Sequence, residues 1–109
     1  MIVVSDTTPL ISLMKAGQLN FLEKYFGEVL IPEAVFRELT SNIRFADEAG
    51  QIRGCQFIHV VKVDDGKSVN LLRRATGLDL GESEAIVLSD DVQADLLLMD
   101  EAKGRESLE

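Results

Sequence analysis

Two aspartates follow apolar segments of the chain in the same way, which suggests a shared place in the fold. Asp6 ends "VVSD", one residue after the β-branched run 2–4, and Asp100 ends "LLMD", directly after the apolar run 96–99. In an open parallel sheet, ligands bind at the carboxyl ends of the strands where the strand order reverses. We therefore expect Asp6 and Asp100 at one sheet edge. A turn or helix N-cap is the alternative role for Asp6.

Two glutamates on predicted helices are candidates for the same edge. Glu38 follows Val35 by three positions and precedes Leu39, which places it at the border of a buried helix face. Glu84 lies in the first turns of a later helix, and Glu82 precedes it by two positions. Residues two apart on a helix point to different sides, so only one of this pair is expected at the site. A solvated surface position is the alternative for each glutamate alone.

Carboxylate oxygens are hard ligands, so a convergence of these acids would suit Mg²⁺ or Mn²⁺. The chain offers no competing cluster of softer ligands, because Cys55 and His59 are its single cysteine and histidine. Cys55 is predicted to be an inert structural thiol, and His59 a packed strand residue. A bound metal would also change whether the chain can bind nucleic acid. The net charge of −8 opposes binding to phosphate backbones, whereas bound divalent cations would invert the local charge.

The alternation of predicted strands and helices indicates an α/β fold with a mostly parallel sheet and helices on its faces. The 109 residues, 46% of them hydrophobic, suffice for one domain spanning 1–109. No apolar run approaches the roughly 20 residues that cross a bilayer, and no secretory signal is present, so we expect a soluble cytoplasmic protein without a membrane partner. Strands are expected at 2–4, 28–31, 57–61 and 96–99, and helices at 8–17, 18–27, 32–40, within 41–54, from about 68, and at 80–93.

Four stretches resemble, in order and spacing, the acidic motifs of the PIN-domain family, which includes VapC-type toxins of toxin–antitoxin pairs and RNA-processing nucleases. They are "SDTTPLISL", "VLIPEAVFREL", "LDLGESEAIVL" and "ADLLLMDEAKGR", and they run to about Arg105. The resemblance implies a three-layer PIN-like α/β fold with a central parallel sheet of strand order 3-2-1-4. It also implies an acidic quartet that binds Mg²⁺ or Mn²⁺, formed by Asp6, Glu38, Glu84 and Asp100.

The family pattern also bears on the residues around this quartet. It places the third acid directly before the apolar run "AIVL", which favours Glu84 and leaves Glu82 in reserve. A hydroxyl beside the first aspartate contacts a ligand carboxylate or a phosphate in the family, so Thr7 and Thr8 are candidate substrate-binding residues. A helix cap is the alternative role for both threonines.

The end of the sequence carries two further expectations. The subfamily tends to have a basic residue where this chain has Ala102, and Lys103 and Arg105 are candidates for the phosphate contacts. PIN domains usually continue through another helix and a fifth strand, which we expect to be absent here. The fourth strand would then expose an apolar edge, and covering that edge predicts a homodimer.

The function implied by the resemblance is metal-dependent hydrolysis of single-stranded RNA by an endoribonuclease, including a role as the toxin of a toxin–antitoxin pair with an antitoxin partner. One alternative is a catalytically silent, truncated PIN-like module that only binds a partner. Another is a phospho-acceptor receiver domain. A receiver would require paired acids after the first strand and an aspartate after the third, but "VVSDTT" has one acid and "FIHVV" is followed by Lys62.

Overall fold

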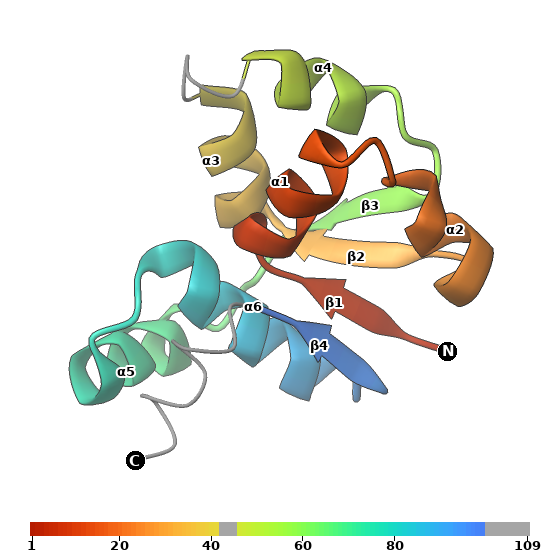
Figure 1. The fold of residues 1–109 in the computed structure, drawn as a ribbon. Coiled ribbons are helices and arrows are strands. Elements are labelled where there is room, and N and C mark those ends of the chain that lie inside the picture. Colours follow the sequence, from red (N-terminus) through yellow and green to blue (C-terminus); the bar gives the residue numbers. More distant parts are fainter. Residues whose placement is uncertain (42–45, 100–109) are drawn as a thin grey trace.

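A four-stranded parallel sheet of order β3-β2-β1-β4 organises the computed structural model, which describes residues 1–41 and 46–99 (Figure 1). The predicted α/β class and strand order are therefore confirmed. The strands are β1 (Val3–Ser5), β2 (Val29–Pro32), β3 (Ile58–Val61) and β4 (Leu96–Leu98). The helices are α1 (Thr7–Lys15), α2 (Asn20–Phe26), α3 (Glu33–Ser41), α4 (Ala46–Arg53), α5 (Gly66–Thr76) and α6 (Leu80–Asp91).

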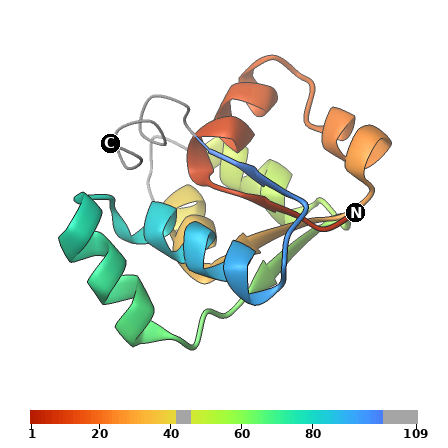
Figure 2. The ribbon, with the colours of Figure 1, turned by 90° about the horizontal axis from the view of Figure 1, so that it is seen from below.

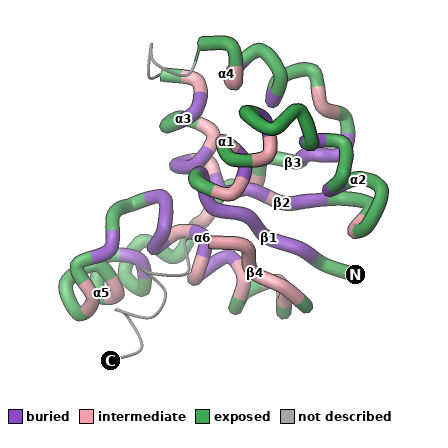
Figure 3. Tube along the Cα trace, in the orientation of Figure 1, coloured by how far each residue is buried: buried purple, intermediate pink, exposed green. Residues whose placement is uncertain are grey.

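Strand β1 lies inside the sheet because its short apolar run is buried on both faces. Val3 belongs to the larger hydrophobic core, while the next residue, Val4, belongs to a second core on the opposite face. Successive side chains of a strand point to opposite faces, so two adjacent valines serve both cores. Figure 3 shows β1 buried and β4 partly buried at the sheet edge. The sheet is thus the middle of three layers.

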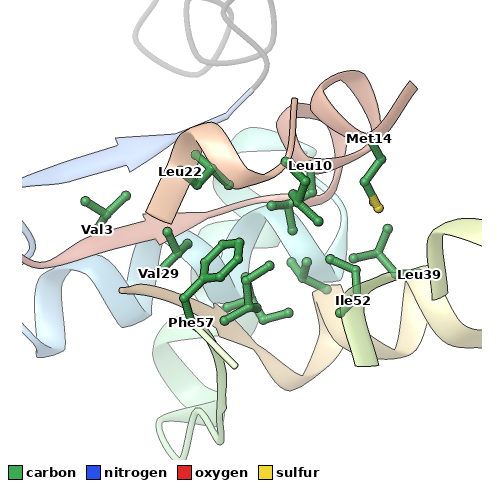
Figure 4. Close-up of a cluster of buried hydrophobic side chains, with 12 residues drawn as sticks. Val3, Leu10, Met14, Leu22, Val29, Leu39, Ile52 and Phe57 are labelled. Carbon is green, nitrogen blue, oxygen red and sulfur yellow. The ribbon is translucent and has the colours of Figure 1, made fainter. Parts of the chain in front are cut away.

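The larger core lies between the sheet and helices α1 to α4, and α6 covers the other face (Figures 1 and 2). Buried Leu10 and Met14 of α1 belong to the same cluster as Val29 of β2 and Phe57, which directly precedes β3 (Figure 4). On the opposite face, Ala85 and Leu88 of α6 pack with Val4. Helix α3 packs against both α1 and α6. This contact brings α3 to the end of β1.

Register places the carboxyl ends of β1 and β4 side by side. Val3 pairs with Leu96, and Ser5 pairs with Leu98. The backbone N–H of Asp6 donates to the carbonyl oxygen of Leu98 at 2.8 Å, which extends the pairing one residue beyond β1. The sequence prediction that Asp6 lies where the strand order reverses is therefore consistent with this register.

Several element boundaries differ from those predicted by the sequence. Helix α5 begins at Gly66, before the predicted start near Ser68, because the Asp65 side chain caps it and accepts from the Ser68 backbone N–H at 3.1 Å. The region 41–54, expected to be helical, contains the end of α3 and all of α4. The predicted site residues Asp100, Lys103 and Arg105 lie outside the described residues. Across residues 1–41 and 46–99, no helix is long and apolar enough to span a membrane.

Candidate active site

Asp6 occupies the end of β1 as a buried carboxylate, with only 3% of the residue exposed. It is also the N-cap residue of α1, but its side chain makes no capping hydrogen bond. Burial raises the pKa of Asp6 from 3.8 to about 6. The backbone N–H of Thr7 acts against this shift, whereas the carboxylates of Glu82, Asp79 and Glu38 add to it. A helix cap therefore does not explain why this acid is buried.

Glu38 reaches the same edge of the sheet from α3. The hydroxyl of Thr7 donates to Oε2 of Glu38 at 2.9 Å, so the start of α1 holds this carboxylate. Gly81 of α6 leaves the space that Glu38 uses, because a Cβ atom at position 81 would lie 3.2 Å from Oε2 of Glu38. Thr7 is buried, whereas Thr8 is exposed. Of the two threonines singled out in the sequence, Thr7 is the one that contacts a candidate acid.

Glu82 is buried at the start of α6 in a reciprocal arrangement with Asp79. Its backbone N–H donates to Oδ1 of Asp79 at 2.8 Å, and its Oε1 accepts from the Asp79 backbone N–H at 3.1 Å. The positive end of the helix dipole favours negative charge at this position. Both acids act on the pKa of Asp6, with Glu82 the stronger of the two. The first turn of α6 thus contributes two carboxylates to the surroundings of Asp6.

Glu84 points to a different neighbour. Its Oε1 accepts from the backbone N–H of Ala34 at 3.1 Å, in the first turn of α3. Glu84 therefore satisfies one of the backbone donors that a helix leaves unpaired at its N-terminus. The two glutamates of "GESEA" diverge as their spacing predicts: Glu82 lies near Asp6, and Glu84 joins α6 to α3.

The family profile described as PIN domain matches residues 2–109 of this chain. The chain belongs to the PIN domain family. Members of this family are generally nucleases and usually use divalent metal ions. Membership argues against the receiver-domain alternative, since the family and the parallel order β3-β2-β1-β4 agree.

Among solved structures, this PIN domain resembles a chain of a toxin–antitoxin complex from Klebsiella pneumoniae. The TM-score is 0.68 at 16% sequence identity, and the match covers 90% of this chain and 86% of that chain. At this identity, the likeness shows a common fold. No curated protein matches the sequence significantly.

The acids at the β1 end of this PIN domain fit a hard divalent cation in their chemistry. Every charged side chain that raises the pKa of Asp6 is itself a carboxylate, so a cation there would relieve both the burial of charge and the repulsion. Within the described ranges, no three of the His, Cys, Asp and Glu side chains lie close enough together to form a closed metal-binding group. The sequence candidate Asp100 follows β4 outside those ranges.

Asp79 is the functional candidate that the motif analysis missed. The signal is present in "DLGE", because an acidic N-cap followed three residues later by glutamate is a capping-box pattern. That pattern fixes where α6 starts and orients Glu82. Beside Asp79, a cavity of about 490 Å³ opens between α3 and α6, lined by Ala34, Arg37, Glu38, Ser41, Asp79, Leu80 and Gly81.

Proposed function

We propose that this PIN domain is an Mg²⁺- or Mn²⁺-dependent endoribonuclease that hydrolyses phosphodiester bonds in single-stranded RNA. The observation that carries the proposal is the buried carboxylate of Asp6, whose pKa of about 6 reflects burial beside three further acids. A buried acid among acids destabilises the metal-free fold, and strongly perturbed carboxylates cluster at functional sites. Family membership supports the same assignment.

We propose that Asp6, Glu38, Glu82 and Asp100 hold the cation. The three described acids do not form a closed group without it, so their side chains would have to turn toward the bound cation. This choice differs from the preference for Glu84 based on the family pattern. The Glu84 side chain accepts from the N-terminus of α3, whereas the charge of Glu82 raises the pKa of Asp6. We propose that Glu84 is a positioning residue, because its hydrogen bond from the Ala34 backbone N–H links α6 to α3, the helix that carries Glu38.

A bound divalent cation would lower the pKa of an attacking water and neutralise charge on the scissile phosphate. The chain's own residues orient the carboxylates, and Asp6 is buried at the base of the site. Thr7 fixes Glu38 through a hydrogen bond of 2.9 Å, and Asp6 is held by the strand end and by the bond from its N–H to Leu98. No covalent nucleophile is needed for hydrolysis of this kind.

Single-stranded RNA is the proposed substrate class because Glu38 and Asp79 line a cavity at the site rather than a protruding element. Side chains cannot reach into the deep, narrow major groove of an RNA duplex, whereas unpaired strands can be drawn to an open edge. Thr8, which is exposed, and the basic residues Lys103 and Arg105 remain proposed substrate contacts.

We also propose two protein partners. The structural neighbour comes from a toxin–antitoxin complex, which supports a toxin role with an antitoxin as partner. Strand β4 lies at the sheet edge with all three leucines partly exposed, which supports a homodimer that covers this edge.

Cleavage of a labelled single-stranded RNA tests the proposed activity. We expect weak cleavage with Mn²⁺, loss of cleavage with EDTA, and a loss of at least about 100-fold in Asp6→Asn, because a misplaced ligand displaces the reacting groups. Activity should also fall steeply as salt rises. Equal cleavage by the wild-type protein and Asp6→Asn would contradict the assignment and point to a contaminating nuclease.

A further inference from the structure

The cavity between α3 and α6 contains one basic residue among its acids. Arg37 lines it together with Glu38 and Asp79, and the side chains of α3 and the first turn of α6 form its walls. Figure 1 shows these two elements next to each other at the end of β1. The volume of about 490 Å³ is within the range of sites that take ligand-sized groups. Arg37 is therefore the one lining side chain that carries positive charge beside Glu38 and Asp79.

Arg37 is not part of an ion pair with any described residue. Glu33 lies four positions earlier on α3, at the spacing that favours a helical ion pair, yet no contact within 4.0 Å joins them. The ion pairs among the described residues are instead His59 with Glu28 and Lys62 with Asp64. The guanidinium group of Arg37 is therefore exposed and available on the side where the cavity opens.

We propose that Arg37 binds a phosphate of the RNA strand adjacent to the acidic site and so sets the position of the scissile bond. This inference rests on the proposed function and adds a residue to it. A planar guanidinium group can donate two parallel hydrogen bonds to phosphate oxygens. The next residue, Glu38, carries one of the proposed metal ligands. Arg37 would thus hold the RNA strand and Glu38 the cation, and their place on one helix would fix the two relative to each other.

An anionic ligand of this cavity needs compensating positive charge. The acids on its walls repel any anion that approaches without a compensating charge, and the net charge of the chain is −8. A phosphate that meets both a cation at the acids and the guanidinium group of Arg37 is neutralised on two sides. Arg37 is accordingly a positioning residue for the nucleic-acid backbone.

Binding of a short fluorescein-labelled, 2′-O-methylated single-stranded oligonucleotide, measured by anisotropy with Mg²⁺ present across a range of salt concentrations, tests the proposal. We expect Arg37→Ala to weaken binding by about three- to ten-fold and to reduce the slope of log Kd against log salt by about 0.7, the value for one lost phosphate contact on a single strand. Arg37→Lys should restore the slope because it keeps the charge. Arg53→Ala, which removes an exposed arginine of α4, is the matched control and should change neither quantity.

The outcomes separate this inference from the proposed function. If the wild-type protein binds and Arg37→Ala has the same slope of log Kd against log salt, the role of Arg37 is overturned. The proposed function is not affected by that result. An equal loss of slope in Arg53→Ala would overturn the role of Arg37 as well, because the effect would then reflect overall charge. No binding by the wild-type protein at any salt concentration would overturn both the RNA substrate and the contact. Since Arg37 is exposed on a helix and alanine favours helices, Arg37→Ala should fold normally.

Discussion

Asp6→Asn is expected to stabilise the metal-free protein by about 2–3 kcal/mol at neutral pH, which is unusual for a change at a buried residue. Burial beside Glu82, Asp79 and Glu38 raises the pKa of Asp6 from 3.8 to about 6. The ionised form is therefore disfavoured in the folded state relative to the unfolded chain. Asparagine keeps the shape and the acceptor oxygen of the side chain but removes the charge.

The sign of the pH dependence follows from the raised pKa of Asp6. Between pH 3.8 and about 6 the folded state holds a proton that the unfolded chain has released, so the free energy of unfolding falls as pH rises through this range. Below it the wild-type protein and Asp6→Asn should be about equally stable. Above it the variant should melt about 10 °C higher in EDTA, from the typical relation between free energy and melting temperature.

Thermal melting in EDTA across this pH range measures the effect. Asp91→Asn is the matched control, because Asp91 is an exposed acid of α6 and its replacement should alter stability by no more than about 0.5 kcal/mol. An Asp6→Asn variant that is less stable than the wild-type protein at neutral pH would show that the charge of Asp6 is satisfied within the chain.

Glu82→Gln and Glu84→Gln form a matched pair that separates the two glutamates of α6. Glu82→Gln should reduce metal-dependent RNA cleavage by at least about 100-fold, whereas Glu84→Gln should reduce it by less than about ten-fold. Each glutamine keeps an oxygen that can accept the observed backbone hydrogen bond, from Asp79 in one case and Ala34 in the other. Both folds should therefore persist, and the difference reports the role of the charge.

The control for this pair is stability. Glu84→Ala removes the acceptor at the start of α3 and should destabilise the protein by about 1 kcal/mol, as for other lost helix caps. Glu84→Gln should retain most of that stability. A reversed pattern of cleavage, with Glu84→Gln inactive and Glu82→Gln active, would restore Glu84 as the third acid and overturn the assignment made from the contacts.

Much of the fold could be predicted from local patterns and the family resemblance. The apolar run before Asp6 predicts a buried strand, and Val3 and Val4 do serve the two cores on opposite faces of the sheet. The strand order came from the resemblance and is confirmed by the register of β1 with β2 and β4. Such features depend on short-range periodicity and on the right-handed crossovers of parallel sheets.

The choice between Glu82 and Glu84 could not be made in this way. Their spacing shows that they point to different sides of α6, but which side faces Asp6 depends on the rotation of the helix about its axis. Packing of Ala85 and Leu88 against Val4 sets that rotation. The capping box at the start of α6 was the one local signal available, since it orients the Glu82 side chain.

The roles of Thr7 and Thr8 depend on tertiary contacts in the same way. Both follow Asp6 in the sequence, but only Thr7 turns inward, where its hydroxyl donates to Glu38 of a helix 31 positions away. No periodicity of α1 alone specifies that contact, because it requires α3 to lie across the start of α1.

Calorimetric titration of Mn²⁺ into the metal-free protein tests most directly whether these acids form a cation site. The wild-type protein and Glu84→Gln should bind Mn²⁺, and binding should be lost in Asp6→Asn and Glu82→Gln, because each of these removes a ligand charge from the end of β1. The absence of Mn²⁺ binding by the wild-type protein, as expected of a PIN domain that only binds a protein partner, would contradict the account, as would undiminished binding by Glu82→Gln.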